Sequence, residues 1–212
     1  MKDLLIINLK AYQKGIGQSA NELIRSLQQL ESENIIVCLN PVDTFLAHQT
    51  DVTCYAQHAD PVEYGSHTGH IVLESLVEYG CKGLIINHSE DTVAPLTVDS
   101  LVQKCKNLGV KSIVCVPSVE KVKEYTLFEP DAIAIEPPEL IGGDVSVSSA
   151  QPELIERAVE ESTVPLLCGA GVKTAEDVSK AKSLGAKGVL IASGVVKHDE
   201  PIVAVKNLLS GF

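Results

Sequence analysis

The feature that most constrains the fold is an alternation, repeated eight times, between short apolar runs and longer amphipathic stretches. The runs are LLIINL, IIVCLN, VTCYAQ, GLIINH, SIVCVP, AIAIEP, PLLCGA and GVLIAS, which begin near residues 4, 35, 52, 83, 112, 132, 165 and 188. Short, β-branched runs that are apolar almost throughout are typical of strands buried on both faces of a parallel sheet. The sequence therefore predicts eight parallel strands.

Amphipathic stretches between these runs predict the helices. Their ranges are 19–32, 41–49, 71–79, 97–108, 118–125, 152–161, 174–184 and 201–209. Thr174, followed three residues later by Asp177, has the pattern of a helix start, and Thr97 and Ser118 are further predicted N-caps.

The regular spacing of strands and helices indicates one closed structure. Eight strand and helix pairs in 212 residues average about 26 residues each, and no linker or low-complexity segment divides them. We predict an α/β fold, a short (β/α)8 barrel that forms a single catalytic domain over residues 1–212. A doubly wound open sheet is the alternative.

The composition limits the binding partners and the cellular compartment that we expect. The formal net charge is −11 and no cluster of Lys and Arg could follow a phosphate backbone, so we expect no nucleic acid partner. No apolar run approaches the ~20 residues of a membrane span, and the start MKDLLIINLK lacks the form of a signal peptide. We predict a cytoplasmic protein whose six cysteines are reduced and hold neither a disulfide nor a metal.

Polar side chains stand where three of the predicted strands end, which is the end that carries the active site in this kind of barrel. Asn8 and Lys10 point to one side because strand side chains alternate. His88 follows the fourth run, and with Ser89 as a cap its ring would face the N-terminus of a short helix, which favours neutral imidazole. The ordinary alternatives are a solvated lysine and a structural histidine.

Glu136 ends the sixth run, in which alanine and isoleucine alternate. If the isoleucines face the helices, Ala132 and Ala134 face the barrel axis and Glu136 stands above them. A partly desolvated carboxylate there would have a raised pKa, which suits a general base. A solvated strand end is the alternative.

Glycines after the last two strands predict a phosphate site. Gly169, Gly171 and Gly194 allow backbone N–H groups to approach a ligand, and Thr174 opens a helix just beyond. A dinucleotide site is disfavoured because the third glycine of its motif is absent. The segment GSHTGH at 65–70 is more typical of a loop than of a metal-ligand pair.

Five motifs, taken in order, resemble one family. They are Asn8-Leu9-Lys10, NHSE at 87–90, EPPELIG at 136–142, CGAG at 168–171 and ASG at 192–194, and together they resemble triosephosphate isomerases in their short archaeal form. The resemblance extends from the first strand to the last. It implies a cofactor-free isomerase that interconverts dihydroxyacetone phosphate and D-glyceraldehyde 3-phosphate in glycolysis and gluconeogenesis.

The resemblance also implies a role for each polar residue. Glu136 would remove a proton from carbon, while His88, as a neutral donor, and Lys10, as a cation, would stabilise the enediolate oxygens. Asn8 would help to place the substrate, and Glu90 would be a supporting acid.

The remaining implied features are the phosphate contacts, a lid and an oligomer. The implied phosphate contacts are Ile141, Gly142, Gly171, Ala192, Ser193 and Gly194. A lid at about 137–144 would close over the substrate, and here it carries Gly143-Asp144 in place of the usual Thr-Gly. The loop Gly65–His70 would dock into a second copy, which implies a homodimer and allows a tetramer.

Three rival functions remain from the sequence alone. A metal-dependent pentulose-phosphate epimerase would need His and Asp ligands on several strand ends, and a Schiff-base aldolase would use Lys10 as nucleophile. An inactive barrel could also bind sugar phosphates as a sensor.

Overall fold

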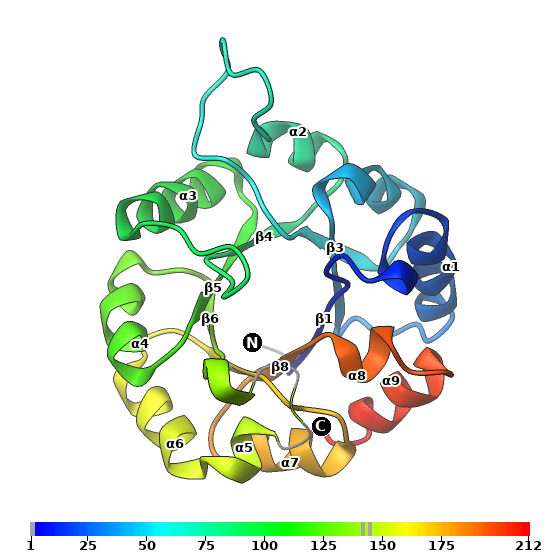
Figure 1. Ribbon diagram of the computed structural model, residues 1–212, viewed down its shortest axis with the longest axis vertical. Helices are drawn as coiled ribbons and strands as arrows, with labels where there is room; N and C mark the ends of the chain where they lie inside the picture. The colour runs from blue at the N-terminus through cyan, green and yellow to red at the C-terminus, as the bar shows by residue number, and fades with distance from the viewer. Residues whose placement is uncertain (1–2, 141–142, 144–145) are drawn as a thin grey trace.

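A closed barrel of eight parallel strands forms the centre of the computed structural model, which describes residues 3–140, 143 and 146–212 (Figure 1). The strands are β1 (Leu4–Asn8), β2 (Ile35–Leu39), β3 (Thr53–Ala56), β4 (Gly83–Ile86), β5 (Lys111–Val116), β6 (Ala132–Ile135), β7 (Leu166–Gly169) and β8 (Gly188–Ile191). They pair in chain order, and β8 closes the ring on β1 with Ile6 opposite Leu190. The predicted (β/α)8 barrel is confirmed, and the open sheet is wrong.

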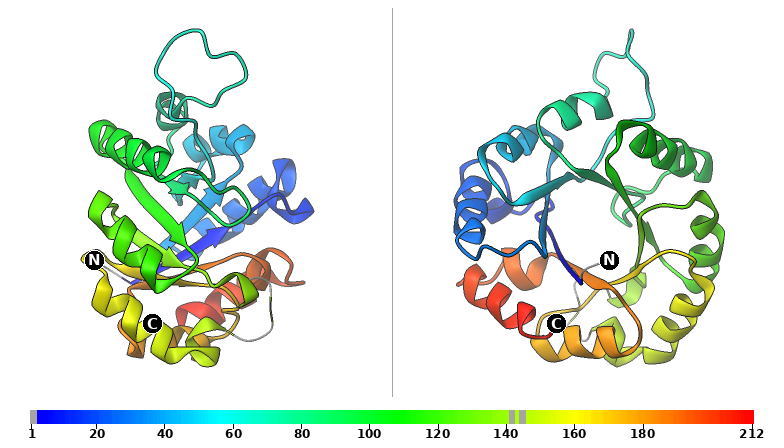
Figure 2. Two further views of the ribbon diagram at one scale, coloured as in Figure 1. Left: turned by 60° about the vertical axis from the view of Figure 1, so that its left-hand side comes forward. Right: turned by 180° about the vertical axis from the view of Figure 1, so that it is seen from behind.

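Helices surround the barrel (Figures 1 and 2). They are α1 (Gly17–Gln28), α2 (Leu73–Glu78), α3 (Pro95–Leu108), α4 (Val119–Tyr125), α5 (Val147–Ala150), α6 (Pro152–Glu161), α7 (Ala175–Ser183), α8 (Ser193–Val196) and α9 (Pro201–Leu209). Short 3-10 helices are η1 (Gln13–Gly15), η2 (Pro41–Gln49), η3 (Thr126–Phe128) and η4 (Pro138–Leu140). Within the described ranges, no helix has both the length and the apolar character needed to cross a membrane.

The predicted helix starts had different outcomes. Thr174 caps α7 in a full capping box with Asp177, as predicted. Thr97 is not a cap, because α3 already begins at Pro95, whose fixed φ and missing N–H suit the first helical position. The stretch 41–49 is a 3-10 helix, and the sequence did not predict the short helices α5 and α8.

Two apolar layers fix which side chains reach the barrel mouth. Ala132 and Ala134 belong to the cluster inside the barrel, whereas Ile133 and Ile135 pack in the cluster that includes the helices. The predicted orientation of β6 is therefore confirmed. Since side chains alternate, Glu136 continues the inward-facing series at the open end of the barrel.

One segment, residues 61–70, projects from the barrel as a loop without helix or strand (Figure 2). Its base is closed by a bridge between Asp60 and Val72 and by the N–H of Ile71, which donates to Asp60 Oδ2 at 2.6 Å. The buried ammonium of Lys104 lies 3.0 Å from Glu74 Oε2 beside this base. The loop is thus exposed along its length but anchored at both ends.

Candidate active site

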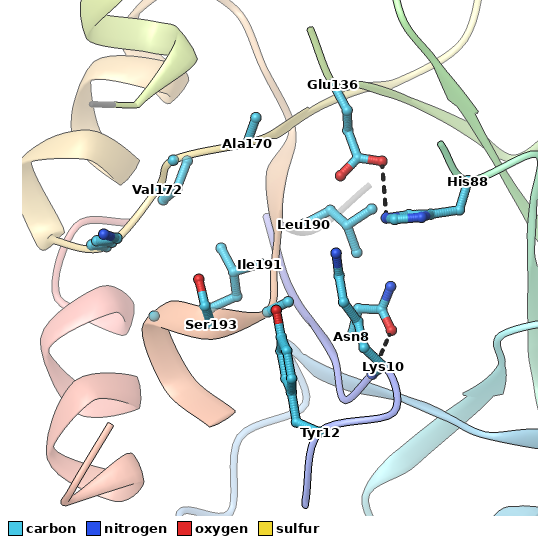
Figure 3. Close-up of a pocket in the computed structure, with 14 residues that line it drawn as sticks. Asn8, Lys10, Tyr12, His88, Glu136, Ala170, Val172, Leu190, Ile191 and Ser193 are labelled. Carbon is cyan, nitrogen blue, oxygen red and sulfur yellow. Dashed lines mark hydrogen bonds and ion pairs between the residues drawn. The ribbon is translucent and has the colours of Figure 1, made fainter. Parts of the chain in front are cut away.

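A pocket at the carboxyl ends of the strands brings most of the predicted site residues together (Figure 3). Its lining comprises Asn8, Lys10, Tyr12, His88, Glu136, Ala170, Gly171, Val172, Lys173, Leu190, Ile191, Ala192, Ser193 and Gly194. Glu90 lies beside it, in contact with two of these side chains. Ile141, Gly142 and Asp144 lie outside the described residues.

Glu136 is a buried carboxylate aimed at His88. Its residue is 6% exposed, and Oε2 lies 3.5 Å from His88 Nε2 (Figure 3). Within the described part of the chain, this oxygen has no hydrogen-bond partner. Burial raises the pKa of the Glu136 carboxyl, against the opposing attraction of His88 and Lys10. The group can therefore hold or release a proton closer to neutrality than an exposed glutamate.

His88 is oriented by a backbone contact that fixes its tautomer. The N–H of Glu90 donates to His88 Nδ1 at 3.2 Å, so in neutral imidazole the proton lies on Nε2, which faces Glu136. The predicted short helix after Ser89 is wrong: residues 89–91 form a turn, and the turn supplies the N–H. Asn87 holds this turn against β5, because its side-chain Nδ2 donates to Cys115 O at 2.9 Å.

Lys10 sits in a turn held by two amide side chains. Its φ is 49°, a conformation that costs free energy for a residue with a side chain. The N–H of Lys10 donates to Asn8 Oδ1 at 3.0 Å, and its carbonyl accepts from Gln57 Nε2 at 3.3 Å. The Lys10 ammonium lies 2.7 Å from Glu90 Oε1. Glu90 thus contacts both Lys10 and His88.

The position of Gly169 indicates another role than the predicted one, in which its backbone N–H would approach a ligand. A Cβ atom added there would lie 2.3 Å from Glu136 Cγ and 2.7 Å from Oε1. The missing side chain leaves space for the Glu136 carboxylate, which packs across the end of β7. Gly171 keeps the predicted placement in the pocket wall, with φ of 72° after Ala170 at 73°.

The far end of the pocket is formed by the loops after β7 and β8. Ala192 is the N-cap of α8, and Ser193 and Gly194 are its first two residues; the N–H groups that open a helix have no partner inside it. A Cβ atom added at Gly194 would lie 3.2 Å from Val172 O, so the two loops are in close approach. Backbone donors here suit an anionic group.

Sequence reasoning missed three residues of this site. Tyr12 and Lys173 line the pocket from loops. In a loop, the sequence has no periodic pattern from which the direction of a side chain could be predicted. Cys115, on β5, interacts with the Glu136 carboxylate and lowers its pKa, against the larger effect of burial. The alternation of SIVCVP would have placed Cys115 on the inner side, but we treated it as a small apolar residue.

No metal cluster accompanies the pocket in the ranges described. Among residues 3–140, 143 and 146–212, no three His, Cys, Asp or Glu side chains are arranged to hold a metal ion. The six cysteines are all buried and unpaired with one another. The described lining of the pocket supplies one buried carboxylate, one imidazole, two lysine side chains, two hydroxyl groups and a group of backbone donors.

This chain is similar to known proteins over nearly its whole length. The family model described as triosephosphate isomerase matches residues 3–208. A triosephosphate isomerase of Methanocaldococcus jannaschii is 42% identical, covering 97% of this chain and 98% of that protein. One from Saccharolobus solfataricus is 41% identical, covering 98% of this chain and 95% of that protein. Both relatives are archaeal, as the resemblance implied.

A solved structure supports the fold independently. The crystal structure of triosephosphate isomerase from Bartonella henselae matches with a TM-score of 0.69 and 20% sequence identity, covering 92% of this chain and 94% of that chain. At 20% identity, this similarity supports the barrel fold only. The match to the family model and the nearly full-length relatives establish more: this chain is an isomerase that belongs to the triosephosphate isomerase family.

Proposed function

We propose that this protein interconverts dihydroxyacetone phosphate and D-glyceraldehyde 3-phosphate through an enediolate, without a cofactor. The observation that carries the proposal is the pair of Glu136 Oε2, buried and unpartnered among the described residues, and His88 Nε2 at 3.5 Å. A base and a neutral donor that face each other in one pocket suit proton transfer between neighbouring carbon and oxygen atoms.

Glu136 removes the proton from substrate carbon and returns it to the neighbouring carbon. Its raised pKa makes the carboxylate a stronger base than an exposed glutamate. His88 donates its Nε2–H to the oxygen on which charge develops, because Nδ1 is already occupied by the N–H of Glu90. The ammonium of Lys10 stabilises the same negative charge.

Glu90 supports the site by orienting both electrophiles. Its N–H fixes the tautomer of His88, and its carboxylate lies 2.7 Å from the Lys10 ammonium. Asn8 contributes by holding the turn that carries Lys10 and by lining the pocket. These contacts preorganise the donors before charge develops.

The phosphate group of the substrate binds at the far end of the pocket. We assign its contacts to the backbone of Gly171, Ala192, Ser193 and Gly194, with Ile141 and Gly142 completing the set from the lid at 137–144. The described part of the lid contains the short helix η4, and the N–H of Gly143 donates to Leu140 O at 3.1 Å. Closure would exclude water and protect the enediolate from loss of phosphate.

The rival chemistries fit the pocket less well. A Schiff-base lysine must attack as an unpaired neutral amine beside another cation, whereas Lys10 Nζ lies 2.7 Å from the Glu90 carboxylate. An epimerase of the metal-dependent type needs a ligand cluster at the strand ends, and the residues described there supply one histidine and one glutamate to the pocket.

A coupled assay on the two triose phosphates tests the function directly. We expect turnover in both directions, unchanged after exhaustive chelation, because the proposed steps need only protein groups. The control is the same protein with divalent metal added back. Activity that disappears with the chelator and returns with the metal would contradict the proposal.

We further propose that the protein is a homodimer formed through the loop Gly65–His70. The loop is exposed and anchored at its base. Tyr64, directly before it, is an exposed apolar side chain, and so are Val42 and Phe45 on the segment after β2. Covering such side chains with a second copy would remove apolar surface from water, which favours association.

Sedimentation equilibrium measures the association state. We expect a mass of twice 22.6 kDa for the parent and of one chain when residues 65–70 are replaced by a short glycine linker. A mass of four chains would mean that two dimers pair. A dimer that persists without the loop would contradict the assignment of the interface.

A further inference from the structure

Tyr12 presents an unused hydroxyl group to the pocket. It follows β1 and lines the same cavity as Ser193 and Glu136, and Figure 3 shows its phenol reaching from the loop toward the side lined by Ser193. Within residues 3–140, 143 and 146–212, this hydroxyl has no hydrogen-bond partner. The hydroxyl is therefore available to a polar group of a ligand that enters the pocket.

Two contacts hold Tyr12 and its loop against the segment after β8. The ammonium of Lys197 lies over the Tyr12 ring, 4.5 Å from the ring centroid. Lys14, two residues further along, donates to His198 O at 3.2 Å. Lys197 follows α8 directly, so the ring is fixed beside the turn to which the phosphate is assigned.

Because the protein carries a net negative charge, an additional hydrogen-bond donor would strengthen the binding of an anionic substrate. The formal net charge of −11 opposes an anionic substrate at long range, so attraction must come from groups in contact with it. Hydrogen bonds to a charged oxygen are about twice as strong as those between neutral groups. A phosphate group offers several such oxygens, and a phenol reaches them without adding a flexible charged side chain.

We propose that Tyr12 donates a hydrogen bond to the substrate phosphate and selects phosphorylated over unphosphorylated trioses, with Lys197 as its positioning residue. The inference rests on the proposed function and adds a side-chain contact to the backbone donors of the phosphate end. Tyr12 takes no part in proton transfer, so its effect falls on binding.

Tyr12→Phe tests the contact, because it keeps the ring and its contact with Lys197 and removes only the hydroxyl. We expect the Kd for inorganic phosphate, measured by titration calorimetry, and the KM for both triose phosphates to rise roughly tenfold, equivalent to about 1.4 kcal/mol, with kcat within about twofold. Tyr79→Phe, at an exposed tyrosine of α2's C-terminus, is the matched control and should leave both unchanged. Turnover of unphosphorylated D-glyceraldehyde should not change in either variant.

Lys197→Met tests the positioning. We expect phosphate affinity to fall about threefold in the parent and not at all in the Y12F background, since Lys197 acts through the hydroxyl. An equal loss in both backgrounds would show that Lys197 acts on phosphate directly, and would overturn its role as a positioning residue.

The outcomes separate this inference from the proposed function. Phosphate affinity in Y12F equal to that in Y79F would overturn the Tyr12 contact even if the parent is an active isomerase. A parent that binds phosphate through Tyr12 yet fails to isomerise triose phosphates would overturn the function and leave the contact standing.

Discussion

Glu136→Gln should lower kcat by roughly 10²–10⁴-fold, because the amide keeps the size of the side chain and removes the proton acceptor. That loss corresponds to about 3 to 5.5 kcal/mol of transition-state stabilisation. Exchange of solvent deuterium into substrate carbon, followed by NMR, should fall in step with isomerisation. Binding of inorganic phosphate should stay at the parental level, since the phosphate end of the pocket is untouched.

The same substitution should raise stability and remove a pH effect. The folded protein holds the Glu136 proton more tightly than the unfolded chain, because burial raises the pKa. The parent therefore loses stability as the pH rises above the ordinary pKa of glutamate, and E136Q should not. In the parent, kcat/KM should fall as the pH drops through the raised pKa. An E136Q protein with near-parental exchange and turnover would mean that another group is the base.

Gly169→Ala should lower kcat by about 10²-fold, although residue 169 itself supplies no reacting group. The new Cβ would lie 2.3 Å from Glu136 Cγ, so the carboxylate must move, and a displacement of about 1 Å can cost a factor of that size. In the E136Q background the substitution should cost little more kcat, since the base is already absent.

A second strand glycine separates this catalytic effect from simple destabilisation. Gly83→Ala would place a Cβ 2.6 Å from the Tyr55 ring inside the barrel, away from Glu136. We expect G83A to lower the free energy of unfolding, measured in urea, while kcat per folded molecule stays near the parental value. If G169A retains full kcat while losing stability like G83A, Gly169 does not hold the space for the base.

The barrel and its main polar residues could be predicted because both depend on local patterns. Apolar runs indicate strands directly: seven of the eight predicted runs contain one strand each, and the fifth coincides with β5 except that the strand begins one residue earlier, at Lys111. Once the runs are ordered into a closed barrel, the residues that end them must meet at one end. Asn8, His88 and Glu136 follow from this argument alone.

The rest of the site depends on contacts between distant segments, which no local pattern reports. Gly169 matters because Glu136, from the neighbouring strand, crosses it. Tyr12 faces the pocket because its loop is tied to the segment after β8. The orientation of His88 comes from a turn whose N–H the sequence assigned to a helix.

The contact between Glu136 and Gly169 also constrains how this site can change over generations. With glutamate at 136, a larger residue at 169 would displace the carboxylate, whereas 136 can shorten while 169 remains glycine. The less costly order of change therefore alters 136 first. A lineage, or a library in directed evolution, that leaves isomerase chemistry by this order passes first through a chain that lacks the full-length glutamate, and its return restores glycine before glutamate.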